Sequence, residues 1–245
     1  MGSIFSKKKE WIEASKWGSI DRVRRLFMET PSLLNCTDDD PMLSLGHENE
    51  NFGDTALISA ARRGHFEVVQ YLAAMGADLD IQASDTALTA AASNGYKAIV
   101  NYLVSVGADL DFRNAYGRTA LIYCIEQIQC SDAVFNLLAA GADPNLQNRE
   151  GETPLLLAAS ANRMDLVNVL IIAGADEGLE SSKKKTPIEC TSCPAIRESL
   201  QSITTPHRER RRLWKQNNWL SLTQRCWIRI RTNPILQQCM NPHYD

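Results

Sequence analysis

The segment "GHFEVVQYLAAMGADLD" (Gly64–Asp80) returns almost unchanged as "GYKAIVNYLVSVGADLD" (Gly95–Asp111). In both copies apolar residues recur every three or four positions, which predicts a helix that ends at Gly-Ala-Asp. Gly-Ala-Asp occurs four times, at spacings of 31, 34 and 33 residues, beginning at Gly76, Gly107, Gly141 and Gly174. A threonine opens each copy at spacings of 31, 33, 34 and 33 residues, namely Thr55, Thr86, Thr119, Thr153 and Thr186. Two independent markers with a period near 33 indicate a stack of repeated units.

Each repeat predicts two helices joined by a tight turn. The threonine hydroxyl can accept a hydrogen bond from a free N–H at the start of the first helix. Gly64 and Gly95 suit the left-handed residue that ends this helix, and Asn162 takes the same place in a later repeat. Because one helix pair cannot bury its own apolar face, neighbouring pairs must stack against each other.

The phrases "TALISAARRGHFEVVQYLAAMGAD" (55–78) and "TPLLLAASANRMDLVNVLIIAGAD" (153–176) resemble the ankyrin repeat. The resemblance covers about residues 10–203. It implies an all-α fold, a solenoid of stacked helix pairs with β-hairpin fingers between the repeats. The His of the usual Thr-Pro-Leu-His motif is replaced throughout, by Ile58, Thr89, Ile122, Leu156 and Glu189. These replacements put the usual hydrogen-bond network between repeats in doubt, and the third repeat has "EQIQCSD" (126–132) instead of a Gly turn.

The repeats and the charge pattern predict three regions. Residues 1–9 form a myristoylation and polybasic segment, residues 10–203 the repeat domain, and residues 204–245 a basic, Trp-rich tail. The repeat domain is divided into a degenerate first repeat (10–36), an acidic insertion (37–52), four repeats (53–82, 83–115, 116–149 and 150–182) and a partial cap (183–203).

Charge and composition narrow the class of protein. The 245 residues have a net charge of −3, but residues 206–245 have eight Lys or Arg and two acids, which leaves −9 for residues 1–205. No apolar run approaches the about 20 residues that cross a bilayer, and the N-terminus lacks the apolar centre of a secretory signal. The seven cysteines have no regular spacing, which is typical of free thiols in a reducing compartment. We therefore expect a cytoplasmic protein.

No pattern in the sequence predicts catalysis. There is no P-loop, no Gly-rich dinucleotide loop and no His-Glu-x-x-His motif. Cys190-x-x-Cys193 and Cys239-x-x-x-His243 could in principle bind zinc, but the 45 residues between the two pairs are unusual for such a site. We expect a non-enzymatic protein without a cofactor or a metal ion.

The resemblance to ankyrin repeats implies a protein partner on the concave surface, which is made of finger tips and of the exposed faces of the first helices. Tyr and Arg are the residue types that most often dominate interface energy. Our candidates at the variable positions are therefore Arg62, Arg63, Tyr116, Arg118 and Tyr123.

The N-terminus, "MGSIFSKKK", matches the M-G-x-x-x-[ST] pattern for N-myristoylation of Gly2. One myristoyl chain gives only marginal membrane binding, so a second signal is needed. Lys7, Lys8 and Lys9 would supply it by attraction to anionic lipids. We expect an attachment to the cytoplasmic face of a membrane.

The tail leaves four alternatives open. Leu222, Cys226 and Ile230 are four residues apart and resemble the box with which suppressor-of-cytokine-signalling box proteins bind elongin C, although no Leu-Pro-x-Pro segment for cullin follows. This alternative makes the protein a substrate receptor of an elongin–cullin ubiquitin ligase. Trp214, Trp219 and Trp227 among arginines also allow an amphipathic helix for a membrane or calmodulin. "RERRR" (208–212) could be a nuclear signal or a nucleic-acid patch, although the acidic body argues against nucleic acid, and the tail could lack a function of its own.

Overall fold

The computed structural model describes residues 2–37, 53–203, 206, 209, 212 and 213. They divide into two compact units, residues 2–109 (unit 1) and residues 110–213 (unit 2). The acidic insertion, apart from Thr37, and most of the tail lie outside the described residues.

Unit 1 is a stack of three helix pairs, each made of a first and a second helix. The pairs are α1 (Gly2–Lys16) with α2 (Ile20–Glu29), α3 (Ala56–Arg63) with α4 (Phe66–Ala74), and α5 (Ala87–Ser93) with α6 (Lys97–Ser105). A short 3-10 helix, η1 (Pro31–Leu33), follows α2. The first helix α3 contacts both α1 and α5, and the second helix α4 contacts both α2 and α6. The repeats of this unit therefore pack layer on layer, as predicted.

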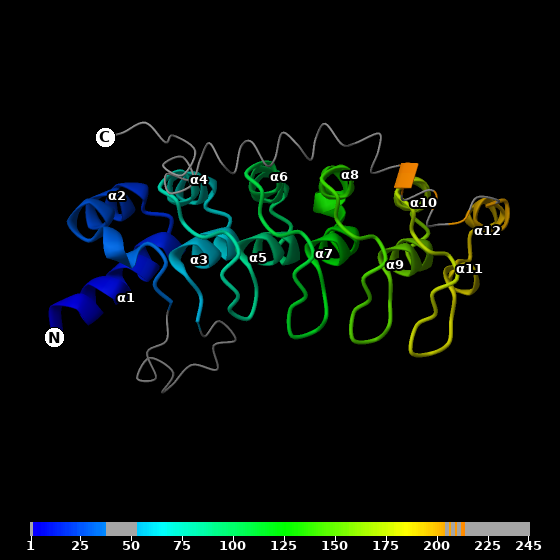
Figure 1. The fold of residues 1–245 in the computed structure, drawn as a ribbon, viewed down its shortest axis with the longest axis horizontal. Helices are drawn as coiled ribbons and strands as arrows, with labels where there is room; N and C mark the ends of the chain where they lie inside the picture. Colours follow the sequence, from blue (N-terminus) through cyan, green and yellow to red (C-terminus); the bar gives the residue numbers. More distant parts are fainter. Residues whose placement is uncertain (1, 38–52, 204–205, 207–208, 210–211, 214–245) are drawn as a thin grey trace, which may run out of the picture. The chain divides into compact units, whose positions relative to one another are not determined.

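Unit 2 has the same construction. Its helices are α7 (Ala120–Glu126), η2 (Ile128–Cys130), α8 (Ser131–Ala139), α9 (Pro154–Ser160), α10 (Met164–Ile172), α11 (Pro187–Cys190) and α12 (Pro194–Gln201). The first helix α9 contacts α7 and α11, and the second helix α10 contacts α8 and α12. Within each unit, Figure 1 shows the first helices in one row and the second helices in another.

The predicted helix caps are confirmed in four repeats. The hydroxyls of Thr55, Thr86, Thr119 and Thr153 accept hydrogen bonds of 3.1–3.3 Å from the N–H groups of Ile58, Thr89, Ile122 and Leu156. Thr186 instead donates its N–H and its hydroxyl to Glu189, at 2.9 and 3.1 Å. Thr89 Oγ1 also accepts from the N–H of Thr86 at 2.8 Å, so two of the residues that replace His still bind back to their threonine.

The turns between paired helices have the predicted left-handed residues. Gly64 has φ +82°, and a Cβ built there would lie 2.6 Å from the ring of Tyr96 in the next repeat. Asn162 takes the same role with φ +54°. The alanine pairs beside these turns are 0% exposed, which allows the helices to approach closely: Ala60, Ala61, Ala91, Ala92, Ala158 and Ala159.

The predicted β-hairpin fingers are not found in the described part of the chain, which has no strand and one isolated bridge between Thr37 and Thr55. The loop before α7 has two turn bonds, from the N–H of Asn114 to the carbonyl of Arg118 (3.1 Å) and from the N–H of Gly117 to the carbonyl of Asn114 (2.8 Å). The side chain of Asn114 takes the place of further ladder bonds, because its Oδ1 accepts from the N–H groups of Tyr116 and Arg118 at 3.0 and 3.1 Å. The loop before α9 is built in the same way around Asn148, so these two fingers are turns fixed by an asparagine.

Consecutive repeats are also joined by hydrogen bonds from a backbone N–H of one repeat to a side-chain oxygen of the preceding repeat. In unit 1 the N–H of Asp78 donates to Asn35 Oδ1 (3.0 Å) and that of Asp109 to Asp80 Oδ1 (2.6 Å). In unit 2 the N–H of Asp143 donates to Asp111 Oδ1 (2.8 Å) and that of Asp176 to Asn145 Oδ1 (2.7 Å). The aspartates of the Gly-Ala-Asp motif are therefore donors through their backbone to the preceding repeat.

The predicted N-terminal segment, residues 1–9, is not separated from the repeat domain by a break in secondary structure. A single helix, α1, begins at Gly2, so the predicted boundary after Lys9 falls inside it. The segment has no Pro or internal Gly after Gly2, and its Lys and Glu residues favour helix, so nothing in the sequence interrupts α1 there. Of the helices that the structure describes, none is long and apolar enough to cross a bilayer.

Candidate protein-binding site

The first predicted partner residue, Arg62, is held inside unit 1. It lies in the last turn of α3, and its guanidinium donates to both carboxylate oxygens of Asp54 (3.0 and 3.2 Å) and to Asp85 (3.0 Å). The side chains of Arg62, Asp54 and Asp85 are only 17%, 4% and 11% exposed. Asp54 precedes the capping threonine of the same repeat and Asp85 that of the next, so Arg62 ties two neighbouring repeats together.

The electrostatics of this network favour the charged form of Arg62. Burial alone would lower the pKa of Arg62, but the hydrogen bonds and charges of Asp54 and Asp85 raise it above its ordinary value. The structure thus gives Arg62 a contact within the fold that sequence reasoning missed. The next residue, Arg63, is exposed at the end of the same helix.

In unit 2, Tyr116 lies at the tip of the loop before α7 and is 62% exposed. Asn114, at the base of this loop, fixes the backbone around it. The carbonyl of Tyr116 accepts from the N–H of Arg149 in the next loop, 3.0 Å away. A large aromatic side chain is therefore presented to solvent from a backbone that is hydrogen-bonded on both sides.

Arg118 and Tyr123 lie beside this loop and contact each other. The guanidinium carbon of Arg118 is 5.6 Å from the centre of the Tyr123 ring, a cation–π distance. Arg118 also donates to Glu126 at 2.9 Å, and the Tyr123 hydroxyl accepts from Asn114 at 2.8 Å. The structure therefore brings three predicted residues, Tyr116, Arg118 and Tyr123, into one part of unit 2.

Glu126, which sequence reasoning did not select, is the acidic member of this group. Burial raises its pKa above the ordinary value, and the charges of Glu152 and Glu150 raise it further against the opposing effect of Arg118. The surface thus has an exposed aromatic ring, one paired arginine and three carboxylates. Its signal in the sequence is a glutamate eight residues after an arginine that precedes a capping threonine.

The N-terminal candidates lie on α1. Gly2 is the first residue of the helix, Lys8 is half-buried and Lys9 is exposed. Lys7 is paired with Glu29 of α2 at 2.9 Å, and this hydrogen bond and charge lower the pKa of Glu29. One of the three lysines that we predicted to face anionic lipid is therefore already neutralised.

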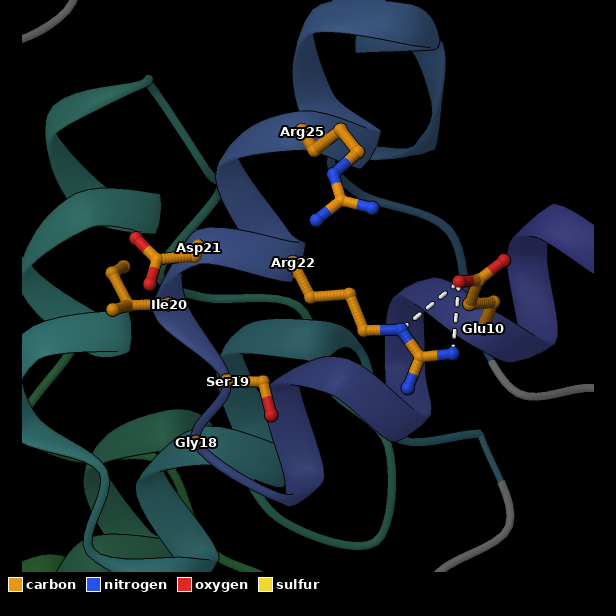
Figure 2. Close-up of a pocket in the computed structure, with 7 residues that line it drawn as sticks. All are labelled: Glu10, Gly18, Ser19, Ile20, Asp21, Arg22 and Arg25. Carbon is orange, nitrogen blue, oxygen red and sulfur yellow. Dashed lines mark hydrogen bonds and ion pairs between the residues drawn. The ribbon is translucent and has the colours of Figure 1, made fainter.

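A pocket of about 620 Å³ lies between the end of α1 and the start of α2 (Figure 2). Arg22 reaches across it from α2 to Glu10 of α1 at 3.0 Å. Its lining residues are Glu10, Gly18, Ser19, Ile20, Asp21, Arg22 and Arg25. The pocket is lined by both acidic and basic side chains and by the glycine turn between the two helices. Its lining shows no nucleophile hydrogen-bonded to a base.

Buried thiols and metal ligands do not form a reactive centre in the described part of the chain. Cys124 and Cys130 are both 0% exposed, and a hydrogen bond between them together with burial raises the pKa of Cys124 well above its ordinary value. No group of three or more metal-ligating side chains occurs among the described residues. Leu222, Cys226, Ile230, Cys239 and His243 lie outside the described residues.

Comparisons with known proteins agree with the repeat architecture. A family model described as ankyrin repeats (3 copies) matches residues 12–114 and 76–148, which together span more than half of the chain. A second model, ankyrin repeats (many copies), matches residues 132–171. An ankyrin repeat protein of Acanthamoeba polyphaga mimivirus is 37% identical over 60 residues, which are 24% of this chain and 14% of that protein.

Proposed function

The chain belongs to the ankyrin-repeat family, and from this premise we propose that it is an adaptor that binds another protein through the loops and first helices of its repeats. Ankyrin repeats are typically non-enzymatic modules that bind protein partners. The observation that favours a site in unit 2 is Tyr116, which is 62% exposed and whose backbone N–H is bonded to Asn114, the residue that also donates to the hydroxyl of Tyr123.

The charge around this site favours a partner with a basic side chain. Glu126, Glu150 and Glu152 make the electrostatic potential there more negative, and Arg118 is already paired with Glu126. An incoming Lys or Arg would offset the repulsion among these carboxylates, while Tyr116 would be buried against an apolar group of the partner.

The test is proximity labelling in cells, followed by capture of the labelled partner on purified wild type and variants. Tyr116→Ala should release the partner. Ile172→Ala is a matched control, because Ile172 is 58% exposed on the second helix α10 of the same unit. Equal capture by wild type and Tyr116→Ala would place the partner elsewhere and contradict this site.

We also propose that Gly2 is myristoylated and that the protein is attached to the cytoplasmic face of a membrane. The support is the M-G-x-x-x-S pattern and the basic residues that follow it on α1. Metabolic labelling with a myristate analogue should modify wild type and leave Gly2→Ala unlabelled. Equal labelling of the two proteins would remove the tether, and intact-mass measurement would show whether Met1 is removed.

A second candidate function is that of a substrate receptor in an elongin–cullin ubiquitin ligase. Only the four-residue spacing of Leu222, Cys226 and Ile230 favours it, because this spacing puts the three side chains on one face of a helix. Elongin should then co-purify with wild type and be lost from Leu222→Ala. Wild type that retains no elongin would exclude this function.

A further inference from the structure

The first helix pair differs in charge from the rest of the repeat region. Residues 1–36 have seven Lys or Arg and four Asp or Glu, a net charge of +3. Residues 37–205 have 11 Lys or Arg and 23 Asp or Glu, a net charge of −12. Any anionic surface would therefore be attracted to the first helix pair and repelled by the repeats that follow.

Two exposed ion pairs join α1 and α2. Lys7 pairs with Glu29 at 2.9 Å, and Arg22 pairs with Glu10 at 3.0 Å. The start of α1 is thus beside the end of α2, as in an antiparallel pair. Arg25 lies on α2 between these two contacts, three residues after Arg22 and four before Glu29.

These two ion pairs occupy two of the cations of the first helix pair and leave others without a carboxylate partner. Lys7 and Arg22 are paired with glutamates, whereas Lys8, Lys9 and Arg25 form no ion pair among the described residues, although the charge of Arg25 helps to lower the pKa of Glu29. Arg25 is exposed, and Figure 2 shows it on α2 beyond Arg22, without an interaction with the other residues drawn.

An apolar side chain accompanies these cations. Met28 follows Arg25 by three residues, so the two are neighbours on the surface of α2, and Met28 is 81% exposed. A flexible apolar side chain next to cations is the combination with which surface helices enter the boundary between lipid headgroups and acyl chains.

We propose that Lys8, Lys9, Arg25 and Met28, here called the cationic edge, form the surface through which the protein contacts an anionic lipid bilayer. This inference rests on the membrane attachment proposed above and adds a second helix to it. Because α1 runs without a break from Gly2, a lipid on Gly2 would insert at the same end of the helix pair. The edge would then set the orientation of unit 1 on the membrane.

The experiment uses the full chain without lipid modification, produced in bacteria, and measures its flotation with vesicles. Wild type should bind vesicles with one quarter phosphatidylserine and not vesicles of phosphatidylcholine alone. Each Lys or Arg near an anionic surface changes the affinity about fivefold, so Arg25→Gln should weaken binding by that factor. Glu29→Gln should strengthen it about fivefold, because it releases the charge of Lys7.

Two variants with the same charge changes in unit 2 serve as controls. Arg149→Gln and Glu180→Gln alter exposed residues outside the edge. They should change the affinity less than about twofold at 0.15 M salt, because charges more than about 8 Å from the lipid surface are largely screened from it. Met28→Ser should weaken binding without changing its dependence on salt.

Wild type that binds both vesicle types equally, or an affinity that Arg25→Gln and Glu29→Gln leave unchanged, would overturn the cationic edge. Loss of binding to a single-stranded RNA oligonucleotide in Arg25→Gln, together with no vesicle binding by wild type, would assign the edge to nucleic acid and overturn it as well. Labelling of Gly2 is measured separately, so a failure of the tether and a failure of the edge are distinguishable.

Discussion

Two ion pairs occupy equivalent positions in different repeats, but the order of the acidic and the basic residue is reversed. In unit 1, Asp54 precedes the capping threonine of its repeat, and Arg62 follows that threonine by seven residues. In unit 2, the same two positions are held by Arg118 and Glu126. The residue before the next threonine joins each pair, Asp85 in unit 1 and Glu152 in unit 2.

The order of charges gives the two networks different roles. In unit 1 a cation lies between two carboxylates, and all three side chains are at most 17% exposed. In unit 2 the carboxylate of Glu126 is paired with a cation and repelled by the charge of another carboxylate, and Glu126 and Arg118 are 28% and 32% exposed. The first network is internally satisfied and stabilises the stack. The second retains repulsion and exposure, which is why we propose it as the place where a partner binds.

The largest expected effect comes from removing the central cation of the first network. Arg62→Ala leaves the carboxylates of Asp54 and Asp85 buried without a counter-charge, which should cost about 3 kcal/mol of unfolding free energy. Urea unfolding followed by circular dichroism measures it. Arg63→Ala, next to it but exposed, should stay within about 0.5 kcal/mol of wild type. Similar losses in both variants would mean that the buried network does not stabilise unit 1.

The corresponding change in unit 2 should affect binding and leave stability almost untouched. Tyr116 is 62% exposed, so Tyr116→Ala should change the unfolding free energy by less than about 0.5 kcal/mol. If Tyr116 is an anchor for the partner, the same substitution should cost about 2 kcal/mol of binding free energy, near thirtyfold in Kd. Calorimetry with the captured partner measures the second quantity, and a loss of stability with unchanged binding would reverse the roles assigned to the two networks.

Most of the helical framework can be predicted from local sequence features that recur in each repeat. Four of the five predicted threonine caps, and the left-handed Gly64 and Asn162, are confirmed. They could be predicted because each depends on residues within one helix pair. The fingers were wrong in detail because Asn114 closes its loop through side-chain bonds that the repeat period does not specify.

The candidate site was harder to predict, because the burial of an arginine decides whether it can contact a partner. Arg62 and Arg118 are both arginines near a finger, and the sequence alone offered both as partner residues. Asp54 and Asp85 close over Arg62 from two repeats, a contact between residues 23 positions apart. Opposite charges at the positions before and seven after the threonine were the signal that could have found these networks.

The pH dependence of Glu126 tests whether the second network is strained. Its folded pKa lies above its ordinary value because of burial and of Glu152 and Glu150, so its contribution to stability is greatest below the unfolded pKa near 4.5. That contribution is lost as the pH rises through the raised folded pKa. Glu126→Gln should therefore gain stability relative to wild type on going from pH 4 to pH 7, by about 0.5 kcal/mol at this part-exposed site. A relative loss over the same range would show that the bond to Arg118 dominates.

The smallest expected effect isolates the repulsion itself. Glu152→Gln removes one negative charge but keeps an amide oxygen that can accept from Asn148, which now donates to Glu152 at 2.9 Å. The pKa of Glu126 should fall toward its ordinary value, because one of the charges that raise it is gone. Carbon-detected NMR titration of the Glu126 side chain measures this shift, with Glu177→Gln as a control for the loss of one charge elsewhere in unit 2. An unchanged pKa in Glu152→Gln would mean that burial alone raises it, and the potential that favours a basic partner would then be absent from this site.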